Sequence, residues 1–334
     1  MPLELKNPDI AFAIESVRLA AQLTEEVRLS LPAAISKLDK SPVTIADFSS
    51  QALVASLLAR QFPGDTFVAE EDSSFLRNSA GARHLADVCR FLTRFVPETT
   101  PEKVLSWIDR GKGTPANGRF WTMDPIDGTK GFLRGEQYAV ALALIVNGQT
   151  EIGVLGCPNL KEARETDIGG QGTLACAVRG QGAWQSSLKG GKTWERLSVS
   201  KRKNVADAIL LRSVESGHTD TGRTGQLIKN FGITRPPLLM DSLAKYAVVA
   251  SGAADLLFRF PSPDNPDRYE WIWDQAPGTI LVEEAGGMVS DLHGKPLDFS
   301  RGRYLTANYG VLLSNGYLHQ TALEAVSKLS HDKN

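Results

Sequence analysis

The first part of the chain carries apolar residues at helical spacing, interrupted by residues that favour turns. Asn7-Pro8 supplies a cap and a first-turn proline ahead of such a pattern, and we expect a helix over residues 8–29. A second helical pattern follows Ser41-Pro42-Val43-Thr44 and ends before Pro63-Gly64. A short strand that ends in acids is expected over residues 66–70.

Two apolar runs in the middle of the chain predict a β-hairpin. The first runs from Tyr138 to Val146, the second covers residues 152–157, and Asn147-Gly148 between them favours a tight turn. Residues 73–118 contain two short helical patterns and a loop with Gly and Pro, and we expect an insertion there. The first half therefore mixes antiparallel sheet with helices.

After Pro158 short strand patterns alternate with helical ones. Strands are expected over residues 173–178, 208–213, 238–240, 255–260 and 311–314, and helices over 225–231, 242–251, 274–285 and the C-terminus. Such alternation is typical of an α/β layer system. We therefore expect two domains, 1–157 and 158–334, the first α+β and the second α/β.

Composition narrows the class of protein. The chain has 334 residues, 42% hydrophobic and 22% charged, which is typical of a globular protein with a large core. A formal net charge of -1 gives no broad basic surface for a nucleic-acid polymer or a membrane. Three cysteines without a C-x-x-C pair indicate reduced thiols, and no apolar run is long enough to span a bilayer, so a cytoplasmic protein is expected.

The segment from Asp124 to Thr129, Asp-Pro-Ile-Asp-Gly-Thr, carries the strongest signal for chemistry. Two carboxylates at a strand end, bent by proline, can converge on one point, as hard divalent cations require of oxygen ligands. Mg²⁺ is the expected cation and the carbonyl of Ile126 a candidate third oxygen, while the N–H groups of Gly128 and Thr129 suit a phosphate. The alternative is an ordinary Asp-Pro turn with a capping aspartate.

Three more acids gain meaning when they are taken together with this segment. Glu70 ends a predicted strand among like charges that repel unless a cation intervenes, although such a cluster is often only a solvated loop. Asp47 falls in the first turn of its helix, where negative charge favours the helix dipole in any case. Asp274 begins a helix, and N-capping is the alternative explanation for it.

These residues make the chain resemble the 3′(2′),5′-bisphosphate nucleotidases, a branch of the lithium-sensitive, magnesium-dependent phosphatases that also include inositol monophosphatase. The resemblance covers nearly the whole chain. Its segments are Ser41 to Thr44 with Asp47, Glu70-Glu71, Asp124 to Phe132, Gly156 to Leu160, and Trp273-Asp274. The continuation Thr129-Lys130-Gly131-Phe132-Leu133-Arg134-Gly135 is similar to the nucleotidase branch, whereas inositol monophosphatases usually continue with Thr-Asn-Phe.

The resemblance implies a fold and a reaction centre. The implied fold is the layered α/β/α/β/α sandwich of the inositol monophosphatase type. Asp47 and Thr129 are implied to take the proton of the attacking water. The groups implied to hold two or three Mg²⁺ ions are Glu70, Asp124, the carbonyl of Ile126, Asp127 and Asp274. Residues 1–157 would thus carry most of the metal ligands, and residues 158–334 the nucleotide contacts with Asp274.

The resemblance also implies a substrate, 3′-phosphoadenosine 5′-phosphate, hydrolysed to AMP and phosphate, with 3′-phosphoadenylyl sulfate as a further candidate. Candidate substrate contacts are Gly128, Thr129, His218, Ser242, Lys245 and Arg259. The chain departs from the family pattern at Gln275 and Pro277, where His and Ala are common, and the segment from Pro261 to Arg268 is longer than usual.

Two other functions stay open at this point. An inositol phosphate phosphatase of the same superfamily is the alternative enzyme, because the metal-binding block is shared. A nucleotide-binding regulator that does not hydrolyse its ligand is the alternative from another class. If the chain is a nucleotidase, the resemblance also implies lithium sensitivity, a part in sulfur assimilation, and a small-molecule nucleotide as partner. It further implies a monomer or weak homodimer.

Overall fold

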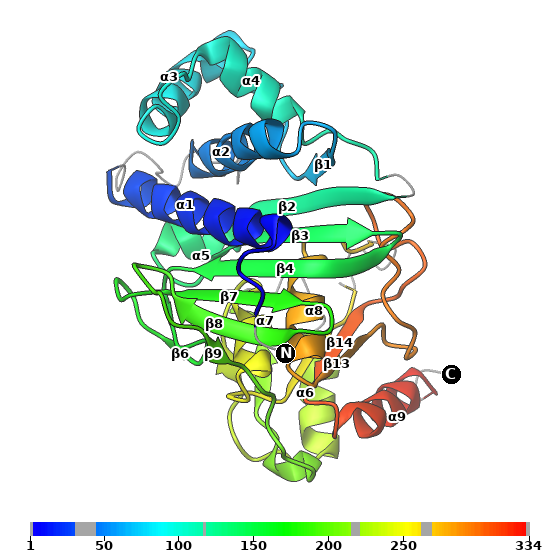
Figure 1. The fold of residues 1–334 in the computed structure, drawn as a ribbon. Helices are drawn as coiled ribbons and strands as arrows, with labels where there is room; N and C mark the ends of the chain where they lie inside the picture. Colours follow the sequence, from blue (N-terminus) through cyan, green and yellow to red (C-terminus); the bar gives the residue numbers. More distant parts are fainter. Residues whose placement is uncertain (1–2, 31–44, 116–117, 215–220, 262–268, 332–334) are drawn as a thin grey trace.

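Layers of helices and strands alternate through the molecule (Figure 1). The computed structural model describes residues 3–30, 45–115, 118–214, 221–261 and 269–331. The expectations for Ser41-Pro42-Val43-Thr44, for His218 and for residues 262–268 fall outside these ranges.

Most of the helices have bounds close to those expected, whereas the two short 3₁₀ turns and α5 were not predicted. The helices and 3₁₀ turns are α1 (Pro8–Ser30), α2 (Ile45–Gln61), η1 (Ser79–Gly81), α3 (Ala82–Leu92), α4 (Pro101–Asp109), α5 (Thr129–Arg134), η2 (Val205–Asp207), α6 (Thr221–Asn230), α7 (Ala244–Ala250), α8 (Ala276–Glu284) and α9 (His319–His331).

The strands form two large sheets and a small two-stranded one. The first large sheet has the order β1-β2-β3-β4-β7-β8-β9, and its strands are β1 (Thr66–Ala69), β2 (Arg119–Asp127), β3 (Ala139–Val146), β4 (Gln149–Cys157), β7 (Thr173–Val178), β8 (Gly182–Ser187) and β9 (Glu195–Arg196). The second has the order β11-β10-β12-β14-β13, from β10 (Leu210–Arg212), β11 (Leu238–Leu239), β12 (Leu256–Arg259), β13 (Met288–Ser290) and β14 (Val311–Ser314). β5 (Leu160–Lys161) pairs with β6 (Glu165–Thr166).

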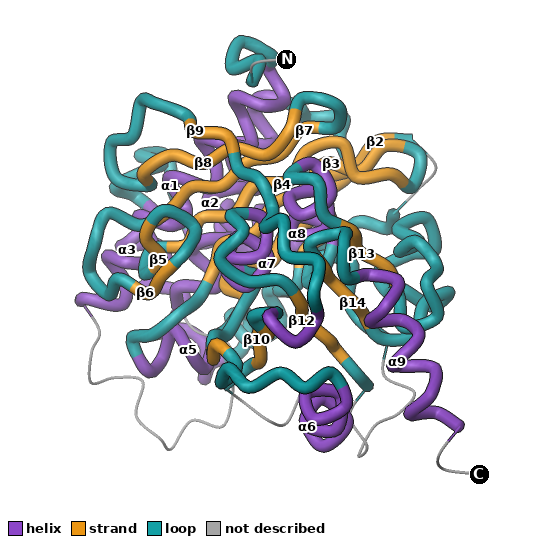
Figure 2. Tube along the Cα trace, turned by 90° about the horizontal axis from the view of Figure 1, so that it is seen from below, coloured by secondary structure: helices purple, strands orange, loops and turns teal. Residues whose placement is uncertain are grey.

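Side-chain alternation along the strands sorts the core into layers. On β3, Val140 and Leu142 pack with α1 and α2, whereas Ala139 and Ala141 belong to the cluster that contains α7 and α8. The second sheet closes that cluster from the other side, and its outer face packs on α6 and α9, which Figure 2 shows beside β10, β12 and β14. The order α/β/α/β/α that results confirms the expected layered sandwich.

Small residues let α8 lie directly on the first sheet. A side chain at Gly153 of β4 would place its Cβ 2.4 Å from Ile280 Cγ2 and 2.5 Å from the carbonyl oxygen of Pro277, so only glycine fits there. Around it the same face is lined largely by alanines, from β3, β7 and β8. The sheet surface therefore sets the height at which α8, and the chain just before it, can sit.

Local elements match the sequence well. The helix expected over residues 8–29 is α1, and the expected hairpin is formed by β3 and β4. Its turn residues Asn147 and Gly148 have φ values of 51° and 78°, the left-handed backbone that a tight hairpin turn requires.

One of the strands expected after Pro158, over residues 173–178, joins a different sheet from the one expected, whereas the later strands form the second sheet. The strand over residues 173–178 is β7, which pairs antiparallel with β4, and β8 and β9 extend the same sheet further. The expected boundary between residues 157 and 158 therefore falls within the seven-stranded sheet. Alternating patterns predict that a strand exists, but they carry no information on the strand with which it pairs.

Two expectations about the chain as a whole can be compared with the structure. Cys89, Cys157 and Cys176 are free thiols, the last two buried in the core. None of the helices in the described part of the chain has the length and apolar character that crossing a bilayer demands.

A buried histidine joins α9 to the second sheet and generates a stability prediction. His319 is 3% exposed, with Nε2 at 2.9 Å from Ser290 Oγ and Nδ1 at 2.9 Å from Ser314 Oγ. Burial lowers the pKa of His319 below its usual 6.5, so the folded state resists protonation more than the unfolded state does. Its contribution to stability is full above pH 6.5 and falls as the pH drops below that value.

We expect His319→Phe to cost about 1–3 kcal/mol at pH 7.5, because two buried hydroxyls lose a partner. The difference from the parent chain narrows at pH 5.5, since phenylalanine does not titrate. Urea unfolding of both proteins in EDTA at the two pH values measures this difference. A difference that is independent of pH would contradict the role assigned to the imidazole.

Candidate active site

The end of β2 carries an irregularity that brings two acids to one side of the strand. Asp124 pairs with Ala141 and Asp127 with Ala139, so three steps along β2 oppose two steps along β3. In a regular strand, residues three apart point to opposite faces. One extra residue in a β-bulge restores the same face, and Pro125, which has no N–H, occupies the bulge without cost to the ladder.

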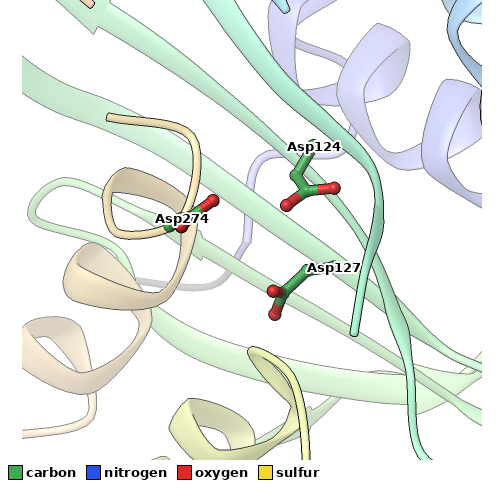
Figure 3. Close-up of side chains that lie close together, drawn as sticks. All are labelled: Asp124, Asp127 and Asp274. Atoms are coloured by element: carbon green, nitrogen blue, oxygen red, sulfur yellow. The ribbon is translucent and has the colours of Figure 1, made fainter. Parts of the chain in front are cut away.

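A third carboxylate approaches this strand end from the second half of the chain. Oxygen atoms of Asp124, Asp127 and Asp274 lie within 4.8 Å of one another. Figure 3 shows the three side chains gathered there, Asp274 reaching in from the segment before α8. Gln275, not Asp274, occupies the N-cap position of α8, so capping does not account for Asp274.

Burial and mutual repulsion strongly perturb these three groups. Burial raises the pKa of Asp124 well above its usual range, and the charges of Glu70, Asp127 and Asp274 add to the effect. Burial followed by the charge of Asp127 does the same to the pKa of Asp274. The pKa of Asp127 is raised by burial, against the opposing charges of Lys245 and Arg259. Each carboxylate therefore disfavours the ionised form of the others.

Glu70 lies next to the cluster, directly after β1. Its side chain keeps contact with solvent, yet partial loss of hydration and the charge of Asp127 raise its pKa to about 7. The neighbouring Glu71 is buried, and loss of hydration together with Asp47 and Glu70 raises its pKa to about 9. Glu70 and Asp274 thus both belong to the same group of interacting acids as Asp124 and Asp127.

Asp47 and Thr129 approach the cluster from two helices. Asp47, in the first turn of α2, is 2% exposed and close enough to Asp124 to raise the pKa of that carboxyl. Thr129 is the first residue of α5, and its hydroxyl donates to the carbonyl oxygen of Ile126 at 3.3 Å. The carbonyl oxygen of Ile126 keeps a second lone pair that can accept another contact. The N–H of Ile126 donates to Asp124 Oδ1 at 3.0 Å.

Ser242 holds the second half of the chain against the bulge. It has a left-handed backbone (φ 68°), which turns the main chain so that the N–H of Leu243 donates to Asp127 Oδ2. The Ser242 Cβ would lie 2.9 Å from a Cβ on Gly128, itself at φ 88°, so glycine is required at this approach. Two candidate substrate residues thus lie beside Asp127.

Two cations, Lys245 and Arg259, lie close enough to the cluster to lower the pKa of its acids, both acting on Asp127 and Arg259 also on Asp274. Lys245 is 3% exposed and donates to Ser213 Oγ at 3.0 Å, and burial together with the charge of Arg259 lowers its pKa to about 8. Arg259 donates to Glu270 Oε2 at 2.7 Å, and the same carboxylate oxygen accepts from Gln275 Nε2 at 2.8 Å. His218, the remaining candidate substrate contact, lies outside the described residues.

The donor set fits a hard divalent cation. Glu70, Asp124, Asp127 and Asp274 offer carboxylate oxygens, which Mg²⁺ prefers. Burial raises the pKa of all four, and neighbouring carboxylates add to the effect. A divalent cation would remove this repulsion and return the groups to their ionised forms.

The structure adds three residues that the sequence did not single out. Glu270, which accepts from Arg259 and Gln275, belonged to no motif. Arg303 belonged to none either, because its contacts to Ala69 and Gly111 join distant segments. Gln51 follows Asp47 by one helical turn, and this spacing could have indicated that both face the site. Its side-chain amide pairs with the main chain of Glu71 in both directions, accepting at 3.0 Å and donating at 2.7 Å.

A layered sandwich with an acid cluster at the end of β2 defines a class of protein. The chain belongs to the inositol monophosphatase family, whose family model matches residues 6–331.

Curated relatives narrow the similarity to one branch. The chain is 42% identical to the 3′(2′),5′-bisphosphate nucleotidase of Schizosaccharomyces pombe, over 95% of this chain and 94% of that protein. It is 39% identical to the 3′,5′-bisphosphate nucleotidase 2 of Arabidopsis thaliana, over 98% of both chains. Solved structures share the fold: the Thermotoga maritima IMPase matches with a TM-score of 0.66 at 21% identity, covering 98% of this chain and 99% of that one.

The repulsion within the cluster leads to a test without substrate. We expect Asp124→Asn, which keeps the shape and the acceptor for the Ile126 N–H, to raise the metal-free melting temperature at pH 8. Relief on the order of 1 kcal/mol corresponds to about 2 °C. Adding 10 mM Mg²⁺ stabilises the parent chain but not the variant, because only the parent binds the ion tightly.

Thermal melts with EDTA and with MgCl₂ measure both effects. Asp207→Asn, at an exposed aspartate of η2, is the matched control and behaves as the parent does. Equal stabilisation of Asp124→Asn and the parent by Mg²⁺ would show that Asp124 does not bind the ion.

Proposed function

We propose that this chain hydrolyses the 3′-phosphate of 3′-phosphoadenosine 5′-phosphate to give AMP and phosphate, with Mg²⁺ as cofactor. The observation that carries the proposal is the pairing of an acid cluster with two cations, the buried Lys245 of α7 and the partly buried Arg259 of β12, whose charges lower the pKa of Asp127. A substrate with two phosphates needs both halves of such a site. The relatives named bisphosphate nucleotidases support the same reading.

The metal ligands in this proposal are the oxygen groups predicted from the sequence. Two or three Mg²⁺ ions would be held by Glu70, Asp124, the carbonyl of Ile126, Asp127 and Asp274. When bound, Mg²⁺ supplies positive charge that stabilises the phosphoryl oxygens and makes water a better nucleophile near neutral pH.

Asp47 and Thr129 are proposed to handle the proton. The attacking water would pass its proton to the Asp47 carboxylate through the Thr129 hydroxyl. For this step the hydroxyl, which donates to the carbonyl of Ile126 in the structure, would turn to donate to Asp47. Asp47 suits this task because α2 holds it buried and close to the acid cluster. The water oxygen would bond to phosphorus while the bond from phosphorus to the ribose 3′-oxygen breaks, and that oxygen would take up a proton from solvent water to become the 3′-hydroxyl of AMP.

The substrate contacts in this proposal come mainly from the second half of the chain, from residues in and next to α7 and β12. Arg259 is held by Glu270 at 2.7 Å, which fixes its planar guanidinium for a forked contact with the 5′-phosphate. Lys245 would add a point charge. Ser242 and Gly128, which lie against each other, would contact the part of the substrate between its two phosphates. His218 belongs to the same proposal as a contact to the nucleotide.

Inositol phosphate hydrolysis is the second candidate, because the family match covers enzymes of that type as well. Inositol monophosphate hydrolysis requires the acid cluster, but it gives Lys245 and Arg259 no second phosphate to bind. The sulfated analogue 3′-phosphoadenylyl sulfate carries both groups and remains a candidate substrate. Lithium sensitivity, a cytoplasmic location, a part in sulfur assimilation and a monomer or weak homodimer belong to the same proposal.

Phosphate release from a panel of substrates tests the function. With MgCl₂ present, we expect turnover of 3′-phosphoadenosine 5′-phosphate to exceed turnover of inositol 1-phosphate, and Asp274→Asn to lower it about 10²-fold or more because charge stabilisation is lost. Asp207→Asn serves again as the control. Preference for inositol 1-phosphate would favour the second candidate, and full activity of Asp274→Asn would remove that residue from the site.

Substrate recognition is tested by Lys245→Gln. We expect KM for 3′-phosphoadenosine 5′-phosphate to rise about 10-fold, since a charge-assisted contact to phosphate is lost. Adenosine 3′-phosphate, which lacks the 5′-phosphate, should show a much smaller change in KM. Lys192→Gln, at an exposed lysine, is the control. Equal effects on both substrates would contradict a contact between Lys245 and the 5′-phosphate.

A further inference from the structure

Arg303 connects two segments that are far apart in the chain, and both of them lead into the acid cluster. Its guanidinium donates to main-chain carbonyls: Nη2 to the oxygen of Ala69 at 2.5 Å, and Nη1 to the oxygen of Gly111 at 3.1 Å. Ala69 is the last residue of β1, and Glu70 follows it directly. The arginine therefore holds the strand end that presents Glu70.

The same strand end is fixed from two further directions. The N–H of Ala69 donates to the oxygen of Gly111 at 2.8 Å, so this oxygen accepts from both Ala69 and Arg303. On the far side of Glu70, the amide of Gln51 binds both main-chain groups of Glu71. Glu70 thus has an exposed side chain on a main chain that is anchored at the residues before and after it.

Arg303 also contacts the segment that carries Asp274. Its main-chain oxygen accepts from the N–H of Ile272 at 3.0 Å, and its guanidinium lies 4.7 Å from the centre of the Trp273 ring. Trp273 is 1% exposed, and it packs with residues of β1 and β2 in a hydrophobic cluster. Asp274 is the next residue, so Arg303 fixes the chain immediately before it.

We propose that Arg303 is a positioning residue for the acid cluster, fixing Glu70 relative to Asp274. The Arg303 side chain contacts the main chain of Ala69, just before Glu70, and the ring of Trp273, just before Asp274. This arrangement sets the separation of two carboxylates that are far apart in the sequence. The inference rests on the proposed function in one respect, namely that the cluster binds Mg²⁺.

The chemistry of the contact requires arginine. A planar guanidinium can donate to two carbonyl oxygens in different directions while its face rests on an indole ring. Lysine keeps the charge and the aliphatic stem, but its single ammonium group cannot reproduce the fork. Arg303→Lys therefore removes the geometry and retains the charge.

Calorimetric titration of Mg²⁺ into the metal-free protein, without substrate, tests the inference. We expect the Kd for Mg²⁺ to rise about 10-fold in Arg303→Lys and further in Arg303→Met, the range found when groups that orient metal ligands are removed. The metal-free melting temperature of Arg303→Lys stays close to that of the parent, and kcat at saturating Mg²⁺ recovers. Arg301→Met, at a surface arginine paired with Asp298 at 2.8 Å, is the matched control and binds Mg²⁺ as the parent does.

The outcomes separate this inference from the proposed function. A parent chain that does not bind Mg²⁺ would contradict the proposed function, and this inference with it. If the parent binds Mg²⁺ and Arg303→Lys binds it equally well, the inference alone is wrong. A lower metal-free melting temperature with an unchanged Kd would also overturn it, because Arg303 would then act on the fold only. Should Arg303→Met fail to fold, Arg303→Lys carries the test.

Discussion

Carboxylates removed from bulk water repel one another, and this repulsion is the constraint around which the site is built. Burial raises the pKa of Asp124, Asp127 and Asp274, and neighbouring carboxylates add to the effect for Asp124 and Asp274. The fold opposes the repulsion with fixed donors: the N–H of Ile126 for Asp124 and the N–H of Leu243 for Asp127. These main-chain donors orient the carboxylate oxygens that would bind a cation.

The site lies where separate layers meet. The bulge of β2 and the N-terminus of α5 belong to the first sheet and its helix, whereas Asp274 precedes α8 and Ser242 precedes α7 in the middle layer. Asp47 comes from α2 on the outer face. Because α2, the first sheet and the helices α7 and α8 each contribute a group, the arrangement exists only when these layers are packed together. The hydrophobic clusters between them are therefore needed for the site as well as for stability.

Much of this could be read from the sequence, and the rest has identifiable reasons for being missed. The Asp124 to Thr129 segment signalled its own turn, because proline, glycine and two acids act locally. The bulge that brings Asp124 and Asp127 to one face was not predictable, since it depends on the register with β3. The pairing of β7 with β4 was missed for a similar reason, as strand patterns do not name partners. Arg303 gave no signal at all, because its role lies entirely in contacts to Ala69, Gly111 and Trp273.

The close packing of α8 on the first sheet makes the position of Asp274 depend on a residue of β4. Gly153 lies against Pro277 and Ile280, and Asp274 stands only a few residues before them. A methyl group on that strand would push the helix outward and carry the aspartate away from its partners. The absence of a side chain at position 153 therefore helps to fix where Asp274 lies, although glycine has no functional group that could take part in the reaction.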